Sequence, residues 1–385
     1  MRLLYWLGFW GALGTLFYVY AGFPLLVIVT AWLRRKRVHQ SSMTPHLSLI
    51  IPCWNEEKTI ATRLENALAL DYPKDRLEII VASDGSDDRT ELIVEGYASA
   101  GVQLLRLPRR GKIYALNAAV EQATGEILVF SDANSMFAPR ALQMLSRNFA
   151  DPEVGGVCGN QIYLKHENID AASQGETMYW SYDKWLKQME SMTGSIVSAH
   201  GAIYAIRRKL YQPPPSAAVT DDFAISTAVV EQGYRLVFEQ EAIAYEHVSP
   251  ATEIEFRRKV RILNRGLRAV FSRRQLLNPL RYSFYAVELL SHKVLRRLVP
   301  LFLVILFVAS IQLSEPRSFY IFAAAGQILF YGLAGVGFLL RRHRLGASRL
   351  LCIPFFYCMA NTAALAAFIM LLSGKRIALW EPQRF

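Results

Sequence analysis

Residues 47–57 read LSLIIPCWNEE, an apolar run that changes abruptly into polar residues. The same change recurs in LEIIVASDGSDD (77–88) and in EILVFSDANS (126–135), and a further apolar run, VQLLRL, covers 102–107. Stretches with helical spacing follow these runs, at 57–70, 88–100, 112–123 and 139–149. Near-continuous Val, Ile and Leu runs separated by helices are typical of a parallel sheet covered on both faces. The pattern predicts an α/β fold with a mostly parallel sheet.

Polar clusters follow three of the predicted strands, at the end where such sheets bind ligands. Asn55 and Glu56 follow the first strand, Asp84 the second, and Asp132 and Asn134 the fourth. Taken alone, each cluster also has a structural explanation, because Asp-Gly is a common turn and Asn, Asp and Glu often cap helices. Their convergence on one edge favours a binding site.

The residue types at this edge restrict the ligand. Neither G-x-G-x-x-G nor G-x-x-x-x-G-K-[ST] follows the first strand, so the sequence supports neither a dinucleotide site nor a P-loop. Carboxylates at strand ends suit Mg²⁺ or Mn²⁺, and such an ion would neutralise a diphosphate leaving group. Lys112 follows Arg109-Arg110-Gly111 and offers a positive charge to the same phosphates, although a solvated surface lysine is an equal explanation.

These residues, in this order, resemble a family 2 glycosyltransferase with a GT-A fold, of the membrane-embedded branch that includes hyaluronan, chitin, cellulose and poly-N-acetylglucosamine synthases. The resemblance covers about residues 46–275. It implies an inverting enzyme that moves a sugar from a nucleotide sugar, with UDP as the expected nucleotide, to a polysaccharide or glycolipid acceptor. The expected cofactor is Mg²⁺ or Mn²⁺.

The resemblance also implies site roles. Asp222, in Thr220-Asp221-Asp222, is expected to be the general base. Asp132 and Asn134 stand at the D-x-D element and are expected to hold the metal, with Asn134 replacing the usual second Asp. The other expected contacts are with the nucleotide sugar (Pro52, Asn55, Glu56, Asp84, Lys112 and Arg261) and with the acceptor (Gly201, Ala202 and Asp221).

One element departs from the family pattern. At the Q-x-x-R-W position of processive synthases the chain has Arg258-Lys259-Val260-Arg261-Ile262, which keeps the Arg and lacks Gln and Trp. A non-processive transferase that adds one sugar to a lipid acceptor is therefore an alternative. A transporter with a nucleotide-binding regulatory domain is an alternative of another class. The absence of charged residues from the expected spans speaks against it, because intramembrane ionisable groups usually mark transport paths.

The composition indicates a membrane protein. Of the 385 residues 52% are hydrophobic and only 19% charged, with a net charge of +11, which excludes a disordered or wholly soluble chain. Four stretches free of Asp, Glu, Lys and Arg approach or exceed the length of a span: 3–33, 298–314, 318–340 and 350–374. The first ends in Arg34–Arg37 without a small-residue cleavage site, which favours an uncleaved anchor (1–37) over a signal peptide.

Basic residues beside spans remain in the cytoplasm, so we expect a protein of the cell (inner) membrane with a cytoplasmic catalytic domain. The region 298–374 is expected to hold about three spans. If 350–374 crosses once, the basic tail 375–385 lies outside, against this rule; Pro354 and Asn361 could instead bend that segment. Four spans are few for a translocation channel, so a homo-oligomer or a partner subunit is a further expectation.

The segment before the second span is strongly basic. Residues 257–274 contain eight basic and no acidic residues, and 276–297 resembles an amphipathic interfacial helix. Docking to anionic lipid is the first interpretation and diphosphate contact the second, and nucleic acid is not expected as a partner. The aromatic residues at 179, 180, 182 and 185 fit an acceptor site or core and interface packing equally well. Trp380 and Arg384 resemble a tail element of the family, and the four cysteines are expected to be reduced.

Overall fold

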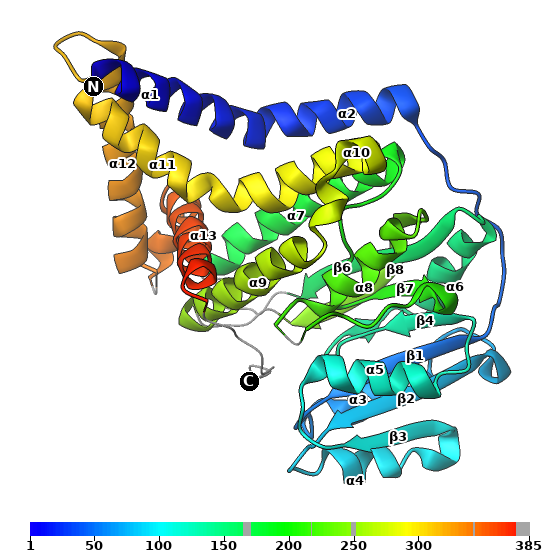
Figure 1. Cartoon of the computed structure of the whole chain (residues 1–385). Helices are drawn as coiled ribbons and strands as arrows, with labels where there is room; N and C mark the ends of the chain where they lie inside the picture. The colour runs from blue at the N-terminus through cyan, green and yellow to red at the C-terminus, as the bar shows by residue number, and fades with distance from the viewer. Residues whose placement is uncertain (165–170, 217, 248–251, 342, 375–385) are drawn as a thin grey trace.

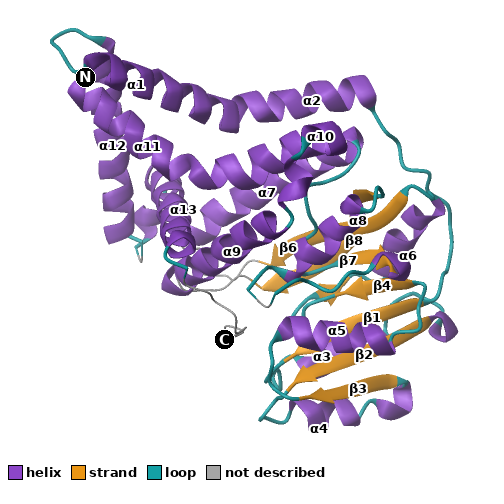
Figure 2. Ribbon diagram, in the orientation of Figure 1, coloured by secondary structure: helices purple, strands orange, loops and turns teal. Residues whose placement is uncertain are grey.

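The chain forms a sheet domain and a group of long helices that lie against one side of it (Figure 1). The computed structural model describes residues 1–164, 171–216, 218–247, 252–341 and 343–374. Strands concentrate in the sheet domain, and the described residues of the region above it form helices joined by loops, with no strand (Figure 2). The sheet domain contains the predicted strands, and the helical part contains the four expected apolar stretches.

The described residues of the sheet domain form one eight-stranded mixed sheet in the order β3-β2-β1-β4-β7-β6-β8-β5. The pairs β1/β2, β1/β4, β2/β3 and β6/β8 are parallel, and β4/β7, β6/β7 and β5/β8 are antiparallel. The strands are β1 (Leu47–Cys53), β2 (Leu77–Asp84), β3 (Val102–Leu107), β4 (Ile127–Phe130), β5 (Met136–Phe137), β6 (Val154–Leu164), β7 (Tyr204–Arg207) and β8 (Arg235–His247). The first four confirm the predicted parallel half.

Helices cover both faces of the sheet, as predicted for strands that are buried on both sides. One hydrophobic core includes residues of α3, α4 and α6, and the other includes residues of α5 and α8. The bounds are α3 (Ile60–Leu68), α4 (Thr90–Glu95), α5 (Lys112–Gln122), α6 (Ala141–Ser146) and α8 (Asp221–Glu231). Both cores draw on β1, whose seven residues are all buried.

Among the described residues, four helical segments are long and apolar enough to cross a membrane. In the first, α1 (Arg2–Phe17) and α2 (Phe23–Arg34) are joined by a π-helical turn, and in the second, α10 (Pro279–Leu289) and α11 (Arg296–Gln312) are joined in the same way. The others are α12 (Phe319–Leu339) and α13 (Arg349–Leu372). The second segment runs from 279 to 312, so the expected interfacial helix and the expected span are continuous, and ionisable residues lie within this segment.

Two further helices, α7 (Ala171–Thr193) and α9 (Thr252–Ser272), lie between the sheet and the membrane helices (Figure 1). Both pack against α13, and α7 also packs against α2. The C-terminal end of α9 packs into a core of the sheet domain through Ala269 and Val270. These helices therefore connect the two parts of the molecule.

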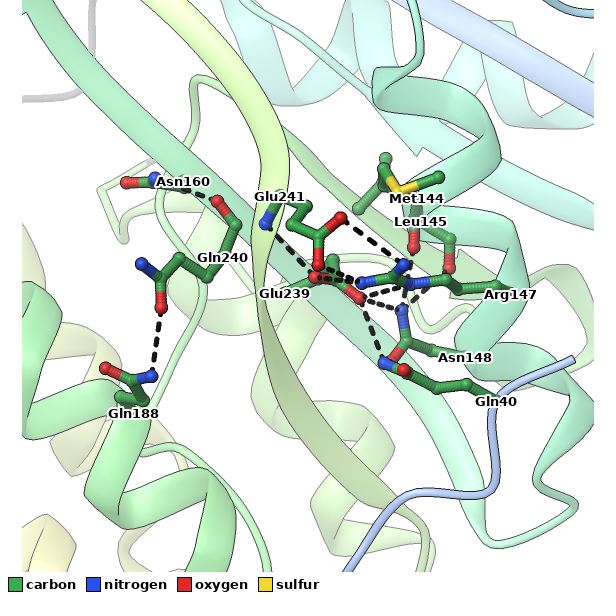
Figure 3. A network of polar contacts seen from close by, with 10 residues as sticks. All are labelled: Gln40, Met144, Leu145, Arg147, Asn148, Asn160, Gln188, Glu239, Gln240 and Glu241. Carbon is green, nitrogen blue, oxygen red and sulfur yellow. Dashed lines mark hydrogen bonds and ion pairs between the residues drawn. The ribbon is translucent and has the colours of Figure 1, made fainter.

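The linker between α2 and β1 is held to the sheet domain by polar contacts (Figure 3). Gln40 donates from Nε2 to Asn148 Oδ1 at 2.9 Å and to Glu239 Oε2 at 3.0 Å. Glu239 is buried and also accepts from Asn148 and Arg147. The backbone N–H of Lys36 donates to Met192 O of α7 at 2.9 Å. The linker thus fixes the end of α2 relative to the sheet domain.

Candidate functional site

A cavity of about 1350 Å³ lies between the edge of the sheet and helices α7, α9 and α13. Most of the predicted site residues line it, although they come from loops far apart in the sequence. They are Asn55, Glu56, Lys112, Asp132, Asn134, Gly201, Ala202, Asp221, Asp222 and Arg261. Among the described residues, Pro52 and Asp84 are the predicted positions that do not line it. Pro52 is buried within β1.

Lys112 joins two of the carboxylates. It is the first residue of α5, and its Nζ lies 2.6 Å from Asp132 Oδ1 and 2.9 Å from Asp221 Oδ2. Burial by itself would lower the pKa of Lys112, but the charges of Asp132 and Asp221 outweigh burial and raise that pKa. In turn Lys112, followed by Arg265, lowers the pKa of Asp221 against the effect of its burial. Lys112 and Asp221 are therefore both charged at neutral pH. The Lys112 side chain is only 11% exposed, so Lys112 is not a solvated surface lysine.

Asp222 has a different electrostatic environment from its neighbour. Burial, followed by the negative charge of Asp221, raises the pKa of Asp222 to about 6. Its Oδ1 accepts a hydrogen bond from the backbone N–H of Phe223 at 2.7 Å, so it stays at the start of α8. A carboxylate whose pKa lies close to the working pH is suited to general-base catalysis.

Glu246 is a site residue that the sequence did not reveal. It lies on β8, lines the cavity, accepts a hydrogen bond from Gln161 Nε2 at 2.5 Å and another from Ser135 Oγ. Burial, followed by the charge of Asp132, raises the pKa of Glu246 to about 7. The only sequence signal was a glutamate inside an otherwise β-prone run, and its partners lie 111 and 85 residues away.

Asn55 and Glu56 connect the loop after β1 to the loop after β2. Asn55 has a φ of 54°, its backbone N–H donates to Ser86 Oγ at 3.0 Å, and its Oδ1 accepts from the backbone N–H of Asp87 at 2.8 Å. The backbone N–H of Glu56 donates to Thr90 Oγ1 at 2.7 Å. The structural and binding explanations of this cluster coexist, since both residues also line the cavity.

Asp84 holds the loop that leads to Lys112. Its side chain is fully buried and accepts from the backbone N–H groups of Arg110 at 2.8 Å and Gly111 at 2.9 Å. It also forms an ion pair with Arg109, whose guanidinium lies 3.7 Å from the ring centroid of Trp54. The structure thus brings Asp132 and Asp222 to one cavity and separates Asp84 from them by this loop.

The residues around Asp132 fit a divalent metal ion that takes only one or two ligands from the protein. The described residues contain no group of three or more His, Cys, Asp or Glu that could hold an ion. Mg²⁺ and similar ions commonly take one or two protein ligands together with substrate phosphates and water. Asp132 keeps 31% of its side chain exposed and Asn134 is exposed, both in the cavity. A Cβ at Gly201 would lie 3.1 Å from Asp132 Oδ2, so a small residue leaves this carboxylate accessible.

The cavity extends beyond the predicted site to the helices that are candidate membrane spans. Lys187 on α7 is 5% exposed and pairs with Asp183 at 3.2 Å, and His292 Nε2 lies 3.3 Å from the same carboxyl group. Lys293, Arg296 and Arg297 also line this end. Sequence reasoning assigned the basic residues around 293 to the membrane surface, because no periodicity shows which face of a helix meets a cavity.

The aromatic cluster divides between cavity and surface. Trp180 and Tyr182 line the cavity, and the Trp180 ring lies 5.1 Å from that of Tyr163. Trp185 is 36% exposed and does not line it. The side chain at 179 and the tail 375–385, with Trp380 and Arg384, lie outside the described residues. All four cysteines are free thiols, as expected.

The model of the family described as "Glycosyl transferase family 2" matches residues 48–213. The chain carries a family 2 glycosyltransferase domain. A protein of Bacillus subtilis (strain 168) named "Probable glycosyltransferase YdaM" is 28% identical over 232 residues, which cover 56% of this chain and 54% of that protein. The poly-beta-1,6-N-acetyl-D-glucosamine synthase of Staphylococcus aureus (strain COL) is 24% identical over 203 residues, which cover 52% and 49%. The chain thus spans about half the length of the curated relatives it matches.

Among solved structures, this chain is similar to the mannosyltransferase PcManGT from Pyrobaculum calidifontis in complex with GDP-Man and Mn²⁺. The TM-score is 0.68 at 24% identity, covering 95% of this chain and 99% of that chain. At this identity the likeness shows the fold. The expectations of a family 2 glycosyltransferase domain and of a GT-A fold are confirmed.

Proposed function

We propose that this protein is an inverting, membrane-located glycosyltransferase that moves one sugar from a nucleotide sugar to an acceptor in the cavity. The observation that carries the proposal is the arrangement around Lys112, which joins Asp132 and Asp221 beside Asp222. Asn55 and residues of the candidate membrane helices line the same cavity. A nucleotide-sugar donor and a membrane acceptor could therefore meet in it.

The reaction is a displacement at the anomeric carbon. An acceptor hydroxyl oxygen forms the new bond to this carbon while the bond from the carbon to the diphosphate oxygen breaks. Asp222 takes the hydroxyl proton, and general-base help of this kind is worth about 10²–10⁴ in rate. The nucleoside diphosphate carries away the bonding electrons. This single displacement needs no second carboxylate as a covalent nucleophile.

Lys112 and Asp132 prepare the leaving-group end of the site. Lys112 presents a fixed positive charge beside the place where the diphosphate is expected, and a preorganised charge of this kind stabilises the transition state. Asp132 and Asn134 would hold Mg²⁺ or Mn²⁺, and the ion would offset the charge that develops on the diphosphate. Arg261 offers a second cation from α9.

Separate observations support the donor candidates and the acceptor candidates. A UDP-sugar is the first donor candidate, on the resemblance to the polysaccharide synthases. A GDP-sugar is the second, because the structurally similar mannosyltransferase was solved with GDP-Man. The acceptor candidates are a growing polysaccharide and a lipid, and the missing Gln and Trp at 258–262 favour transfer of a single sugar to a lipid. The glycosyltransferase domain favours an enzyme over the transporter alternative.

The test uses the full-length protein in lipid nanodiscs with a panel of UDP- and GDP-sugars and Mn²⁺. Release of nucleoside diphosphate and the length of the product on a sizing gel are measured. We expect release with one donor and its loss in Asp222→Asn, while Asp75→Asn, at an exposed carboxylate, behaves as the wild type. Full activity of Asp222→Asn would remove Asp222 as the base, and donor binding without any release would overturn the proposed activity.

A further inference from the structure

The cavity has two ends of opposite charge. Asp132, Asp221, Asp222 and Glu246 lie at the sheet end. At the membrane end, Lys187, Lys293, Arg296 and Arg297 line the wall, and in the described lining of α7 and of 290–297 the one carboxylate facing them is Asp183. An excess of cations in a partly enclosed cleft concentrates anionic ligands. The donor diphosphate is already provided for by Lys112 and Asp132, so the membrane end calls for another anion.

Packing holds these cations in place. A Cβ at Gly266 of α9 would lie 2.5 Å from Arg297 Nη2, so the guanidinium lies directly on the backbone of α9 at a residue without a side chain. Next to it, buried Arg265 donates from Nη2 to Val219 O at 2.6 Å, just before the Thr220-Asp221-Asp222 segment. The Arg296 guanidinium lies 5.1 Å from the ring centroid of Tyr182 on α7. The basic end is thus built from three helices and adjoins the base.

An apolar wall continues from the basic end. Ile353, Phe356, Ala360 and Ala364 of α13 line the same cavity, and Tyr20 of the first membrane segment lies at it too. These helices are long and apolar enough to cross a bilayer. A molecule that fits this cavity along its length is polar at the sheet end, anionic in the middle and apolar where it meets the membrane helices.

We infer that the acceptor is a phosphate-bearing membrane lipid that carries a free hydroxyl beyond its phosphate. Its phosphate is bound by Lys293, Arg296 and Arg297, its chains lie along α13, and its hydroxyl reaches Asp222. This inference rests on the proposed function and supplies its acceptor. In the reaction the lipid hydroxyl forms the bond to the anomeric carbon, its proton passes to Asp222 and the nucleoside diphosphate leaves, so the lipid phosphate stays intact.

Binding is tested without donor, so that its outcome is independent of turnover. Full-length protein in detergent is titrated with phosphatidylglycerol, with diacylglycerol of the same chains and with inorganic phosphate, and bound lipid is counted by native mass spectrometry. We expect phosphatidylglycerol to bind at least tenfold more tightly than diacylglycerol and to remain bound when UDP or GDP is added. Equal binding of diacylglycerol, displacement by inorganic phosphate or displacement by the nucleotide would overturn the inference; the last would assign these cations to the donor.

Variants locate the site. Lys293→Met should weaken phosphatidylglycerol binding at least tenfold, whereas Arg281→Met, an exposed basic residue of the same helical segment outside the cavity, should leave it unchanged. Gly266→Ala displaces the Arg297 guanidinium without removing a charge and should also weaken binding, which covers the case in which Lys293→Met fails to fold. If both Gly266→Ala and Lys293→Met bind phosphatidylglycerol as the wild type does, the proposed phosphate site is wrong. If lipid binds as expected but no nucleotide sugar is turned over, the proposed function fails and the lipid site stands.

Discussion

At the scale of single residues, the pKa values of the adjacent carboxylates Asp221 and Asp222 shift in opposite directions. Lys112 keeps Asp221 ionised, whereas burial and the charge of Asp221 raise the pKa of Asp222 to about 6. The charged groups that face Asp222 are Asp221 on its own helix, Lys112 on α5 and Asp132 after β4. A base must be deprotonated, so we expect kcat/KM to fall about tenfold per pH unit below about pH 6.

The measurement is a pH–rate profile between pH 5 and 8 of nucleoside diphosphate release. Asp222→Asn should lose about 10²–10⁴ in rate together with the acidic limb of the profile. The exposed-site variant Asp75→Asn should keep both. An Asp222→Asn profile with the wild-type limb would assign that limb to another group.

Asp84 provides a second prediction at this scale. Its buried carboxylate accepts from two backbone N–H groups and pairs with Arg109, and Asp84→Asn replaces one of its acceptor oxygens by a donor amide. We expect a loss of unfolding free energy of about 1.5–3 kcal/mol, the usual worth of hydrogen bonds to a charged group. Denaturant unfolding of the purified protein measures it. Unchanged stability combined with a raised KM for the donor would instead support the nucleotide contact that the resemblance implies.

At the scale of elements, the sequence was informative where one strand or helix carries its own signal. The strands β1 and β2 are apolar runs because almost all of their residues are buried, and the edge strand β3 keeps exposed polar residues within its run. Helix α5 follows a basic turn that ends in Gly111. The antiparallel half was not predicted in detail, since β7 has four residues and pairs with strands on either side that are distant in sequence. The basic end of the cavity was not predicted for the same reason, because its residues come together only when three helices pack against one another.

Glu246 on β8 shows how such an element can support the site. It receives hydrogen bonds from Ser135 and Gln161 and lies near Asp132, so it positions the 132–135 loop that would hold the metal. Residues that orient metal ligands typically contribute 10–100-fold to metal affinity or activity. We expect Glu246→Gln to raise the Mn²⁺ concentration for half-maximal activity by about this factor, with a smaller change in the KM of the nucleotide sugar.

The measurement is a Mn²⁺ titration of nucleoside diphosphate release. Glu241→Gln, on the exposed part of the same strand, is the matched control and should titrate as the wild type. A Glu246→Gln variant that loses activity at every Mn²⁺ concentration without a shift in the titration would indicate a role in folding or in acceptor binding instead.

At the scale of the whole molecule, α13 decides the position of the chain beyond it. Asn264 of α9 donates to Ala367 O at 3.0 Å, and the Lys259 Nζ lies 5.1 Å from the ring centroid of Phe356, so α13 follows α9 in the same direction. The short helical turn before α13 (Arg344–Ala347) contacts α7. Both ends of α13 therefore lie beside helices that connect to the catalytic domain, as Figure 1 shows for its last turns and α9.

This packing removes a conflict in the sequence. A single crossing at 350–374 would put the basic tail outside, against the preference of basic residues for the cytoplasmic side. If α13 stays beside α7 and α9, its end lies on the same side as the catalytic domain. We expect a cysteine at Ser373 to share the accessibility of one at Ser99 in the catalytic domain and to differ from one at Ser314, between α11 and α12.

The measurement labels sealed inside-out vesicles with a membrane-impermeant maleimide. A Cys358→Ser background removes the one native cysteine that is not buried. Labelling of Ser99→Cys and Ser373→Cys without Ser314→Cys supports the arrangement and puts the catalytic domain in the cytoplasm. Labelling of Ser373→Cys only in right-side-out vesicles, together with Ser314→Cys, would mean that α13 crosses the bilayer. In that case the contacts of α13 with α7 and α9 could not persist in the membrane, and the apolar wall of the cavity would be lost with them.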